Sequence, residues 1–235
     1  MNQRQCDPRD VITFDGPAAS GKSSVAQRVA QALGVPFVSS GLLYRAATYL
    51  VASAGIDPCD EAAVLRALAA HAVRLEPDTA GNRVRVDADD VSAALHTDRV
   101  DANVSLVAAH PGVRAWVSEQ LREVPAPFVI DGRDMGSVVF PAARHKFYLT
   151  ASPQERARRR VGERAADLSA VAAAIARRDA LDAKQLAPAA DALHVDTDGL
   201  DLDQVVARVL AELAERGLPA LPSEGPAQTR AGAGA

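Results

Sequence analysis

Residues 16–23 leave this chain few choices of architecture, because they fit the pattern G-x-x-x-x-G-K-[ST] at every position: Gly16, Pro17, Ala18, Ala19, Ser20, Gly21, Lys22 and Ser23. In a loop of this kind, successive backbone N–H groups point at a phosphate group and the lysine reaches its outer oxygens. The pattern requires a strand before it and a helix after it. A short β-rich run at 11–14 and apolar residues at helical spacing from Val25 meet that requirement. The sequence therefore predicts a loop that binds nucleotide phosphates.

The alternation of strand and helix continues along most of the chain. Strand-like runs occupy residues 11–14, 36–38, 128–131, 146–150 and, more weakly, 195–197. Ser152, Pro153 and Glu155 indicate the N-cap, first position and capping-box residue of a helix. Five strands alternating with helices predict an α/β fold of the P-loop NTPase type, a doubly wound five-stranded parallel sheet with helices on both faces. In such sheets, ligands bind at the carboxyl ends of the strands.

Residues 57–110 interrupt this alternation. Residues 74–75 and 83–86 resemble two strands joined by the turn-rich segment 77–82, and helical patterns lie on both sides of them. We interpret this region as an insert that contains a small antiparallel β element. A single domain is predicted over 10–217, and the segments 1–9 and 218–235 are expected to be flexible tails.

Composition and charge exclude several classes of protein. Hydrophobic residues make up 48% of the 235 residues and charged residues 24%, which is typical of a chain that folds around a core. A net charge of −4 argues against a nucleic acid polymer as partner, because phosphate contacts need a basic face. No run approaches the roughly 20 apolar residues of a membrane span, and the first residues are polar. We expect a cytoplasmic protein that does not contact membranes, and a monomer as the simplest state.

A phosphate-binding loop alone does not distinguish GTPases, ATP-driven machines and small-molecule kinases. The chain has no N-K-x-D element for reading guanine, which argues against a GTPase. Arginines follow two of the predicted strands instead, Arg45 after the second and Arg133 after the third. We expect both at the sheet edge that carries the phosphate loop, where guanidinium groups would hold the phosphates of two nucleotides. This arrangement favours phosphoryl transfer, which relies on positioning and charge neutralisation.

ATP and Mg²⁺ are the expected cosubstrate and cofactor. Ser23 has the position whose hydroxyl binds Mg²⁺ in such loops, and Asp131, at the end of the third strand, would hold the ion through water. The residues expected to bind ATP are Gly16, Pro17, Ala18, Ala19, Ser20, Gly21, Lys22, Ser23, Ser24 and Arg160.

Three segments together resemble the bacterial-type cytidylate kinases of the nucleoside monophosphate kinase family: the phosphate loop, S-G-L-L-Y-R at 40–45 and D-G-R-D-M-G at 131–136. The resemblance runs from about Val11 to Arg216, and D-G-R-D-M-G is its most specific part. It implies ATP-dependent phosphorylation of CMP and dCMP. It also implies a core at about 10–56, 111–152 and 186–217, a monophosphate-binding insert at about 57–110 and a helical lid at about 153–185.

The resemblance assigns roles to individual residues. Those that it implies for the substrate are Ser40, Arg45 and Arg133 at the phosphate of CMP, Ser105, Arg114 and Asp134 at the cytosine ring, and Arg178 and Asp182 near the sugar and phosphates. Tyr44 is also expected to bind the substrate. The residues expected to take part in catalysis are Lys22, Arg45, Arg133 and Arg178. An arginine donor beside an acidic or hydroxyl acceptor suits the polar edge of cytosine. Two positions depart from the family pattern: Ser39 stands where an aspartate is usual, and Gln185 where an arginine is usual.

Simpler interpretations exist for several of these residues. Arg178 and Asp182 are four residues apart on a predicted helix and would also fit a surface ion pair. The arginines expected in the lid would also fit a solvated helix face: Arg156, Arg158, Arg159, Arg160 and Arg164. Two other functions remain open. One is a P-loop kinase with another acceptor, such as UMP, AMP or shikimate, and the other is a nucleotide-dependent binding module that transfers no phosphate.

Overall fold

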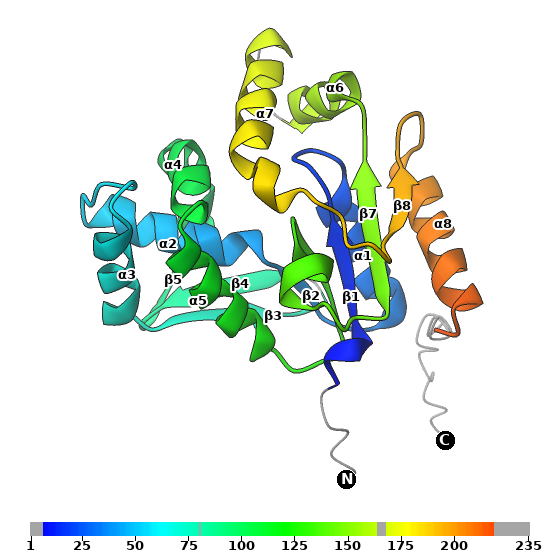
Figure 1. Cartoon of the computed structure of the whole chain (residues 1–235), viewed down its shortest axis with the longest axis horizontal. Coiled ribbons are helices and arrows are strands. Elements are labelled where there is room, and N and C mark those ends of the chain that lie inside the picture. The colour runs from blue at the N-terminus through cyan, green and yellow to red at the C-terminus, as the bar shows by residue number, and fades with distance from the viewer. Residues whose placement is uncertain (1–6, 80, 164–167, 219–235) are drawn as a thin grey trace, which may run out of the picture.

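The computed structural model of the protein describes residues 7–79, 81–163 and 168–218 (Figure 1). A five-stranded sheet lies at its centre, made of β1 (Val11–Asp15), β2 (Phe37–Ser39), β6 (Phe128–Gly132), β7 (His145–Thr150) and β8 (Leu193–Asp196). Every neighbouring pair is parallel, and the order is β2-β6-β1-β7-β8. The chain thus adds strands first on one side of β1 and then on the other, which confirms the predicted doubly wound sheet.

Both faces of the sheet are covered, because all five residues of β1 are buried and point alternately to two layers. Ile12 and Phe14 belong to the layer formed with α1 (Lys22–Leu33) and α8 (Leu202–Glu215). Within it, the Phe14 ring stacks on that of Phe147 with the ring centres 5.0 Å apart. Val11 belongs to the opposite layer, which includes residues of α2 (Gly41–Ser53) and α5 (Pro111–Arg122).

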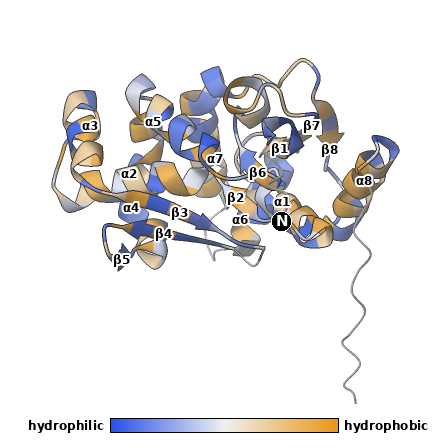
Figure 2. Ribbon diagram, turned by 90° about the horizontal axis from the view of Figure 1, so that it is seen from below, coloured by the Kyte–Doolittle hydropathy of each residue, from blue (hydrophilic) through white to orange (hydrophobic). Residues whose placement is uncertain are grey.

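The second layer continues into the region between β2 and β6. Besides α2 and α5, this region contains α3 (Glu61–Ala70), α4 (Asp98–Ala108), the 3₁₀ turn η2 (Ser92–His96) and a separate sheet of β3 (Val73–Pro77), β4 (Asn82–Val86) and β5 (Asp89–Asp90). The sheet is antiparallel, as the sequence predicts for this region. Figure 2 shows β3 and β4 mostly in the hydrophilic colour, and their inward residues Val73, Val84 and Val86 are buried.

The β3–β4 hairpin is hydrogen-bonded to the edge strand β2. The Phe37 N–H donates to the Asp78 carbonyl at 3.2 Å, and the Ser39 N–H donates to the side-chain oxygen of Asn82 at 3.1 Å. Ser40 follows directly on Ser39. The hairpin therefore supports the end of β2 next to a predicted site residue.

Further helices lie at the carboxyl ends of the strands. A π-helical turn, η3 (Met135–Val139), follows β6, and α6 (Pro153–Glu163), α7 (Leu168–Asp182) and η4 (Ala183–Gln185) connect β7 to β8. In Figure 1, α6 and α7 lie near the loop after β1, while the start of β1 and the end of α8 lie at the opposite end of the sheet. Glu155 N–H donates to the Ser152 hydroxyl at 3.3 Å, so the predicted helix start is confirmed.

Some predicted boundaries differ from the observed ones. Strand β8 begins at Leu193, two residues before the predicted run, because Leu193 pairs with Phe147. At the other end of the chain, Asp7 caps the 3₁₀ turn η1 (Pro8–Asp10) inside the segment expected to be a tail. Residues 1–6 and 219–235, the rest of the expected tails, lie outside the described residues. No helix among the described residues is long and apolar enough to cross a membrane.

Candidate active site

The predicted phosphate loop connects the end of β1 to the first turn of α1. Gly16 has a φ of 148°, and a Cβ atom there would lie 2.2 Å from the carbonyl oxygen of Leu149, so only glycine fits. The Val25 N–H makes the first intrahelical bond of α1, to the Gly21 carbonyl at 3.0 Å. The N–H groups before it are those that bind anions at a helix N-terminus.

Lys22 is buried against this loop, and its Nζ donates to the Pro17 carbonyl at 3.3 Å. Burial lowers the pKa of the Lys22 ammonium to about 7, and the charge of Arg133 acts in the same direction. The carboxylate of Asp131 partly offsets both effects. A phosphate group would supply the negative charge that stabilises this cation.

Asp131 reaches the phosphate loop because β1 and β6 end side by side, with Phe14 paired to Asp131 and Asp15 to Gly132. The Ser23 hydroxyl donates a hydrogen bond to Asp131 Oδ2. The other oxygen, Oδ1, is buried and has no hydrogen-bond partner among the described residues. A hydroxyl beside a carboxylate with an unused oxygen suits a hard cation such as Mg²⁺. Because the described residues contain no group of three metal-binding side chains, phosphate and water would supply the remaining ligands.

Arg133 joins the phosphate loop to α7. Its Nη1 donates to the Gly16 carbonyl at 3.2 Å, and its Nε donates to Asp182 Oδ2 at 3.0 Å. The Nε of Arg178 lies 3.7 Å from the same carboxylate oxygen. The Asp182 side chain is only 15% exposed. Arg178 and Asp182 therefore belong to a part-buried cluster beside the phosphate loop and not to an open helix surface.

Four arginines from different elements gather in this cluster. The pKa of Arg178 is lowered to about 10, mainly by burial and also by the charges of Arg133, Arg45 and Arg160, while Asp182 opposes them. These charge effects require that the guanidinium groups lie near one another. They come from α2, the loop after β6, α6 and α7. Such a concentration of cations beside a phosphate loop is suited to a second phosphate group.

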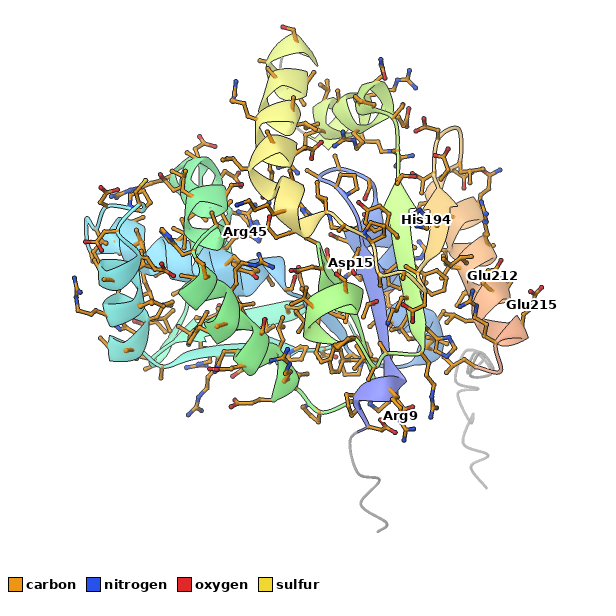
Figure 3. All side chains as sticks on the ribbon, in the orientation of Figure 1. Arg9, Asp15, Arg45, His194, Glu212 and Glu215 are labelled. Atoms are coloured by element: carbon orange, nitrogen blue, oxygen red, sulfur yellow. The ribbon has the colours of Figure 1, made fainter. Side chains whose placement is uncertain are left out.

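Arg45 is held in place by the neighbouring insert. Its Nη1 donates to the Leu95 carbonyl at 2.8 Å, and its Nη2 pairs with Asp101 of α4 at 2.6 Å. Figure 3 shows Arg45 beside α4 and near the lower end of α7, whereas Arg9 lies at the far end of the sheet. Ser40, which is buried, directly precedes α2, and a Cβ atom on Gly132 would lie 2.9 Å from its hydroxyl oxygen.

Two predicted cytosine-binding residues lie in contact. Arg114 of α5 forms an ion pair with the buried Asp134, and its guanidinium carbon lies 5.7 Å from the centre of the Tyr44 ring. Burial raises the pKa of Tyr44 to about 12. Ser105, half-buried on α4, makes no hydrogen bond through its hydroxyl to Arg114 or Asp134 in the described part of the chain.

Two arginines of α6, neither of them in the predicted ATP set, hydrogen-bond the phosphate loop. Arg156 donates to the Ala18 carbonyl at 3.1 Å and pairs with Asp179 of α7, and Arg159 donates to the Ser20 carbonyl at 3.2 Å. Arg160, the expected ATP ligand, acts electrostatically on Arg178. The sequence signal that could have identified Arg156 and Arg159 was their spacing, which places residues 156, 159 and 160 on one face of the helix. Arg158 is exposed, and Arg164 lies outside the described residues.

Sequence reasoning missed Asp15, the last residue of β1. It is buried, and its two carboxylate oxygens accept hydrogen bonds from the N–H groups of Met135 and Gly136, each at 2.8 Å. Its position directly before the phosphate loop was the only signal in the sequence, because its partners are far away along the chain.

The two positions that depart from the family pattern lie in different surroundings. Ser39 is tied through its backbone N–H to Asn82. Gln185 is half-buried at the end of η4, and its neighbour Lys184 is exposed. The remaining member of the predicted ATP set, Ser24, is exposed at the start of α1.

A glycine-rich phosphate loop after the central strand, with a lysine, a candidate metal site and a facing arginine cluster, defines a P-loop phosphotransferase. A family model described as cytidylate kinase matches residues 12–215, and the chain belongs to that family. It is 58% identical over 205 residues to a cytidylate kinase of Thermus thermophilus, covering 87% of this chain and 99% of the relative.

Other cytidylate kinases are also similar to this chain. Identity is 56% over 203 residues to a cytidylate kinase of Deinococcus deserti, covering 86% of this chain and 98% of the relative. It is 41% over 216 residues to that of Geobacillus kaustophilus, covering 87% and 96%. The match therefore extends over nearly the whole length of these relatives.

Proposed function

We propose that the protein transfers the γ-phosphoryl group of ATP to the phosphate of CMP or dCMP, forming ADP and CDP or dCDP. The bond from the β–γ bridging oxygen to the γ-phosphorus breaks, and a bond forms between that phosphorus and an oxygen of the acceptor phosphate. One observation carries the proposal: Arg133 hydrogen-bonds the phosphate loop, the charges of Arg133 and Arg178 act on Lys22, and those of Arg45 and Arg160 act on Arg178. Two phosphate-binding regions in contact are what an in-line transfer between two nucleotides needs.

On the donor side, the loop amides and Lys22 would bind the β- and γ-phosphates of ATP. Arg156 and Arg159 already hydrogen-bond the carbonyl groups of this loop, so they would support its shape from α6. Arg160 would add positive charge on the side of Arg178. The lid proposed for about 153–185 contains these side chains, and its closure would exclude water that could otherwise hydrolyse ATP.

Mg²⁺ would be held by Ser23 and, directly or through water, by Asp131, whose buried Oδ1 is unpaired among the described residues. When bound, the ion would neutralise charge that develops on the transferring phosphoryl group. Ser23 ends the phosphate loop and hydrogen-bonds Asp131 of β6, so an ion held there would lie beside the ATP phosphates.

On the acceptor side, Arg45, Arg133 and Arg178 would bind the phosphate of the monophosphate, together with Ser40. Two of these arginines are now paired with aspartates, Arg45 with Asp101 and Arg133 with Asp182. A phosphate carries more charge than a carboxylate and accepts bidentate hydrogen bonds from a guanidinium, so it can compete for these groups. Asp182, once released by Arg133, could accept a hydrogen bond from the sugar.

Cytosine would be recognised by Arg114 and Asp134, with Tyr44 packed beneath Arg114. The ring displays two acceptors beside one amino donor, which match an arginine and an acidic oxygen. Uracil presents a carbonyl where cytosine has the amino group, so an acceptor of the base would face the acceptor oxygen of Asp134. The insert proposed for about 57–110 carries Ser105, which would complete this pocket when the insert closes.

The proposed function is tested by measuring ADP release with Mg²⁺-ATP and a panel of acceptors: CMP, dCMP, UMP, AMP and shikimate. CMP and dCMP should turn over with kcat/KM at least about tenfold above that of any other acceptor. Turnover of another acceptor without CMP would assign a different substrate. Binding of ATP with no product from any acceptor would favour a binding module. A cytoplasmic location and a monomeric state remain predictions.

A further inference from the structure

The carboxylate of Asp15 lies between the two halves of the proposed site. It is the last residue of β1, and Gly16 of the phosphate loop follows it directly. Its Oδ1 accepts the N–H of Met135 and its Oδ2 the N–H of Gly136, each at 2.8 Å. It is 4% exposed. Because both oxygens are used by backbone donors, Asp15 is poorly placed to bind a ligand or a metal ion.

The segment that Asp15 holds carries acceptor-side groups. Arg133 and Asp134 come directly before the two residues whose N–H groups it binds. Arg133 in turn donates to the carbonyl of Gly16 at 3.2 Å. The end of β1 therefore contacts the segment 133–136 twice, once through the Gly16 carbonyl and once through the Asp15 carboxylate.

The segment also packs tightly against β1 and β7. A Cβ atom on Gly136 would lie 2.7 Å from the Thr13 hydroxyl oxygen and 3.1 Å from Cδ of Lys146. Thr13 is two residues before Asp15, so both side chains lie on the same face of the strand. The chain then continues as the π-helical turn η3, a conformation often found at functional sites. The segment cannot shift toward β1 without steric overlap.

We propose that Asp15 is a positioning residue that fixes the segment Arg133–Gly136 relative to the phosphate loop, and so sets the distance between donor and acceptor phosphates. This inference rests on the proposed function, because the segment matters only if Arg133 and Asp134 bind the acceptor. The position of this segment matters for the rate, since a displacement of about 1 Å can lower a transfer rate about a hundredfold.

The test is the substitution Asp15→Asn, which keeps the shape of the side chain. One of the two backbone N–H groups would then face the amide N–H₂ of asparagine, which is also a donor, and would lose its acceptor. The expected result is an increase in KM for CMP of about tenfold or more and a decrease in kcat of about ten- to a hundredfold. The KM for ATP should change less than about threefold, because the loop amides that bind ATP do not contact Asp15. Equal increases in both KM values, or no change in either, would overturn the proposal.

A matched control separates positioning from loss of stability. Asp201→Ala removes another carboxylate that accepts a backbone N–H, that of Gln204 at 2.8 Å, at the start of α8. It should lower thermal stability and leave both KM values unchanged. If Asp15→Asn does not fold, Gly136→Ala displaces the same segment by its contact with Thr13 and should give the same rise in KM for CMP alone.

A second measurement keeps this inference separate from the proposed function. Amide hydrogen exchange of Met135 and Gly136 should accelerate at least about tenfold in Asp15→Asn, while exchange of Val25 in α1 stays unchanged. If the wild-type protein does not phosphorylate CMP, the proposed function fails, and unchanged exchange at 135 and 136 would show separately that Asp15 does not hold the segment.

Discussion

The two halves of the candidate site are built in different ways. The donor half is one continuous stretch, residues 16–24, and its binding groups are mainly backbone N–H groups and Lys22. The acceptor half takes single side chains from α2, α5, the loop after β6 and α7. Three of its arginines are each paired with an aspartate: Arg45 with Asp101, Arg114 with Asp134 and Arg133 with Asp182.

This difference explains where specificity can reside. A backbone cradle binds any phosphate of the right geometry, and its sequence can vary little without losing its shape. Side chains gathered from separate elements can be exchanged one at a time, so the acceptor half can be adjusted to one base and one sugar. Substitutions in the donor half should therefore reduce turnover with every acceptor, and substitutions in the acceptor half should act selectively.

The largest effect is expected for Lys22→Met. Removing the only lysine of the phosphate loop should lower kcat about 10³- to 10⁴-fold with every acceptor, because its charge stabilises the transferring phosphoryl group. The measurement is ADP release with saturating CMP and dCMP. Arg28→Met on the same helix, an exposed residue paired with Asp203, is the control and should retain normal turnover. A loss confined to one acceptor would contradict the proposed role of the donor half.

Arg133→Ala should lower kcat/KM for CMP about 10²- to 10³-fold, while the Kd for ATP changes less than about threefold. Arg133 contacts Gly16 only through a carbonyl oxygen, so the N–H groups of the loop stay available. Calorimetric titration of ATP and steady-state kinetics with CMP give the two quantities. Arg144→Ala, an exposed residue near Asp10, is the control. Equal losses in ATP binding and CMP turnover would mean that Arg133 is structural.

The contacts of Asp15, which lies between the two halves, can be tested by measuring how the stability of the protein depends on pH. Burial raises its pKa from 3.8 to about 6, and the bonds from Gly136 and Met135 limit that rise. Because the unfolded chain loses this proton first, stability falls as the pH rises from about 4 to about 6. Over this pH interval, the free energy of unfolding of the wild-type protein should fall by about 3 kcal/mol relative to that of Asp15→Asn. This figure follows from the rise in pKa, at about 1.4 kcal/mol per pKa unit.

Urea unfolding of both proteins between pH 4 and 8 measures this difference, since the contributions of other groups cancel. The difference should be constant above pH 6.5. A difference that does not change with pH would show that the carboxyl group is ionised with its ordinary pKa in the folded protein.

Arg114→Met should raise KM for CMP about 10- to 100-fold and change kcat by less than about fivefold. The substitution keeps the packing against Tyr44 but removes the donor to the base and leaves Asp134 without its partner. Discrimination between CMP and UMP should narrow in the same kinetic assays. Arg122→Met, on the same helix but directed at the carbonyls of Val138 and Val139, is the control. Unchanged discrimination would exclude Arg114 from base recognition.

The smallest effect is expected for Gln185→Arg, which restores the arginine usual in the resembling family. Gln185 is half-buried at the end of η4, close along the chain to Asp182. An added guanidinium should lower KM for CMP by about two- to fivefold without altering kcat. Lys184→Arg at the exposed neighbouring position is the control. An increase in KM would indicate that the local geometry has changed to suit glutamine.

The sequence predicts the donor half almost completely and the acceptor half only in part. The phosphate loop is local, so its spacing and flanking elements identify it. Arg45 and Arg133 were identified because they follow strands that must end at one sheet edge. Arg114 and Ser105 required the resemblance, because nothing in their local sequence distinguishes them from surface residues. Asp15 escaped notice because its function depends on a register between β1 and β6 that only the fold defines.

The central claim is that two nucleotides lie end to end between a backbone cradle and a set of gathered arginines. A crystal structure with an analogue that joins adenosine and cytidine through five phosphates tests it directly. We expect the phosphates at the adenosine end on the amides of residues 16–23 and on Lys22, those at the cytidine end on Arg45, Arg133 and Arg178, and cytosine against Arg114 and Asp134. Cytidine bound elsewhere, with these arginines still paired to Asp101 and Asp182, would contradict the account.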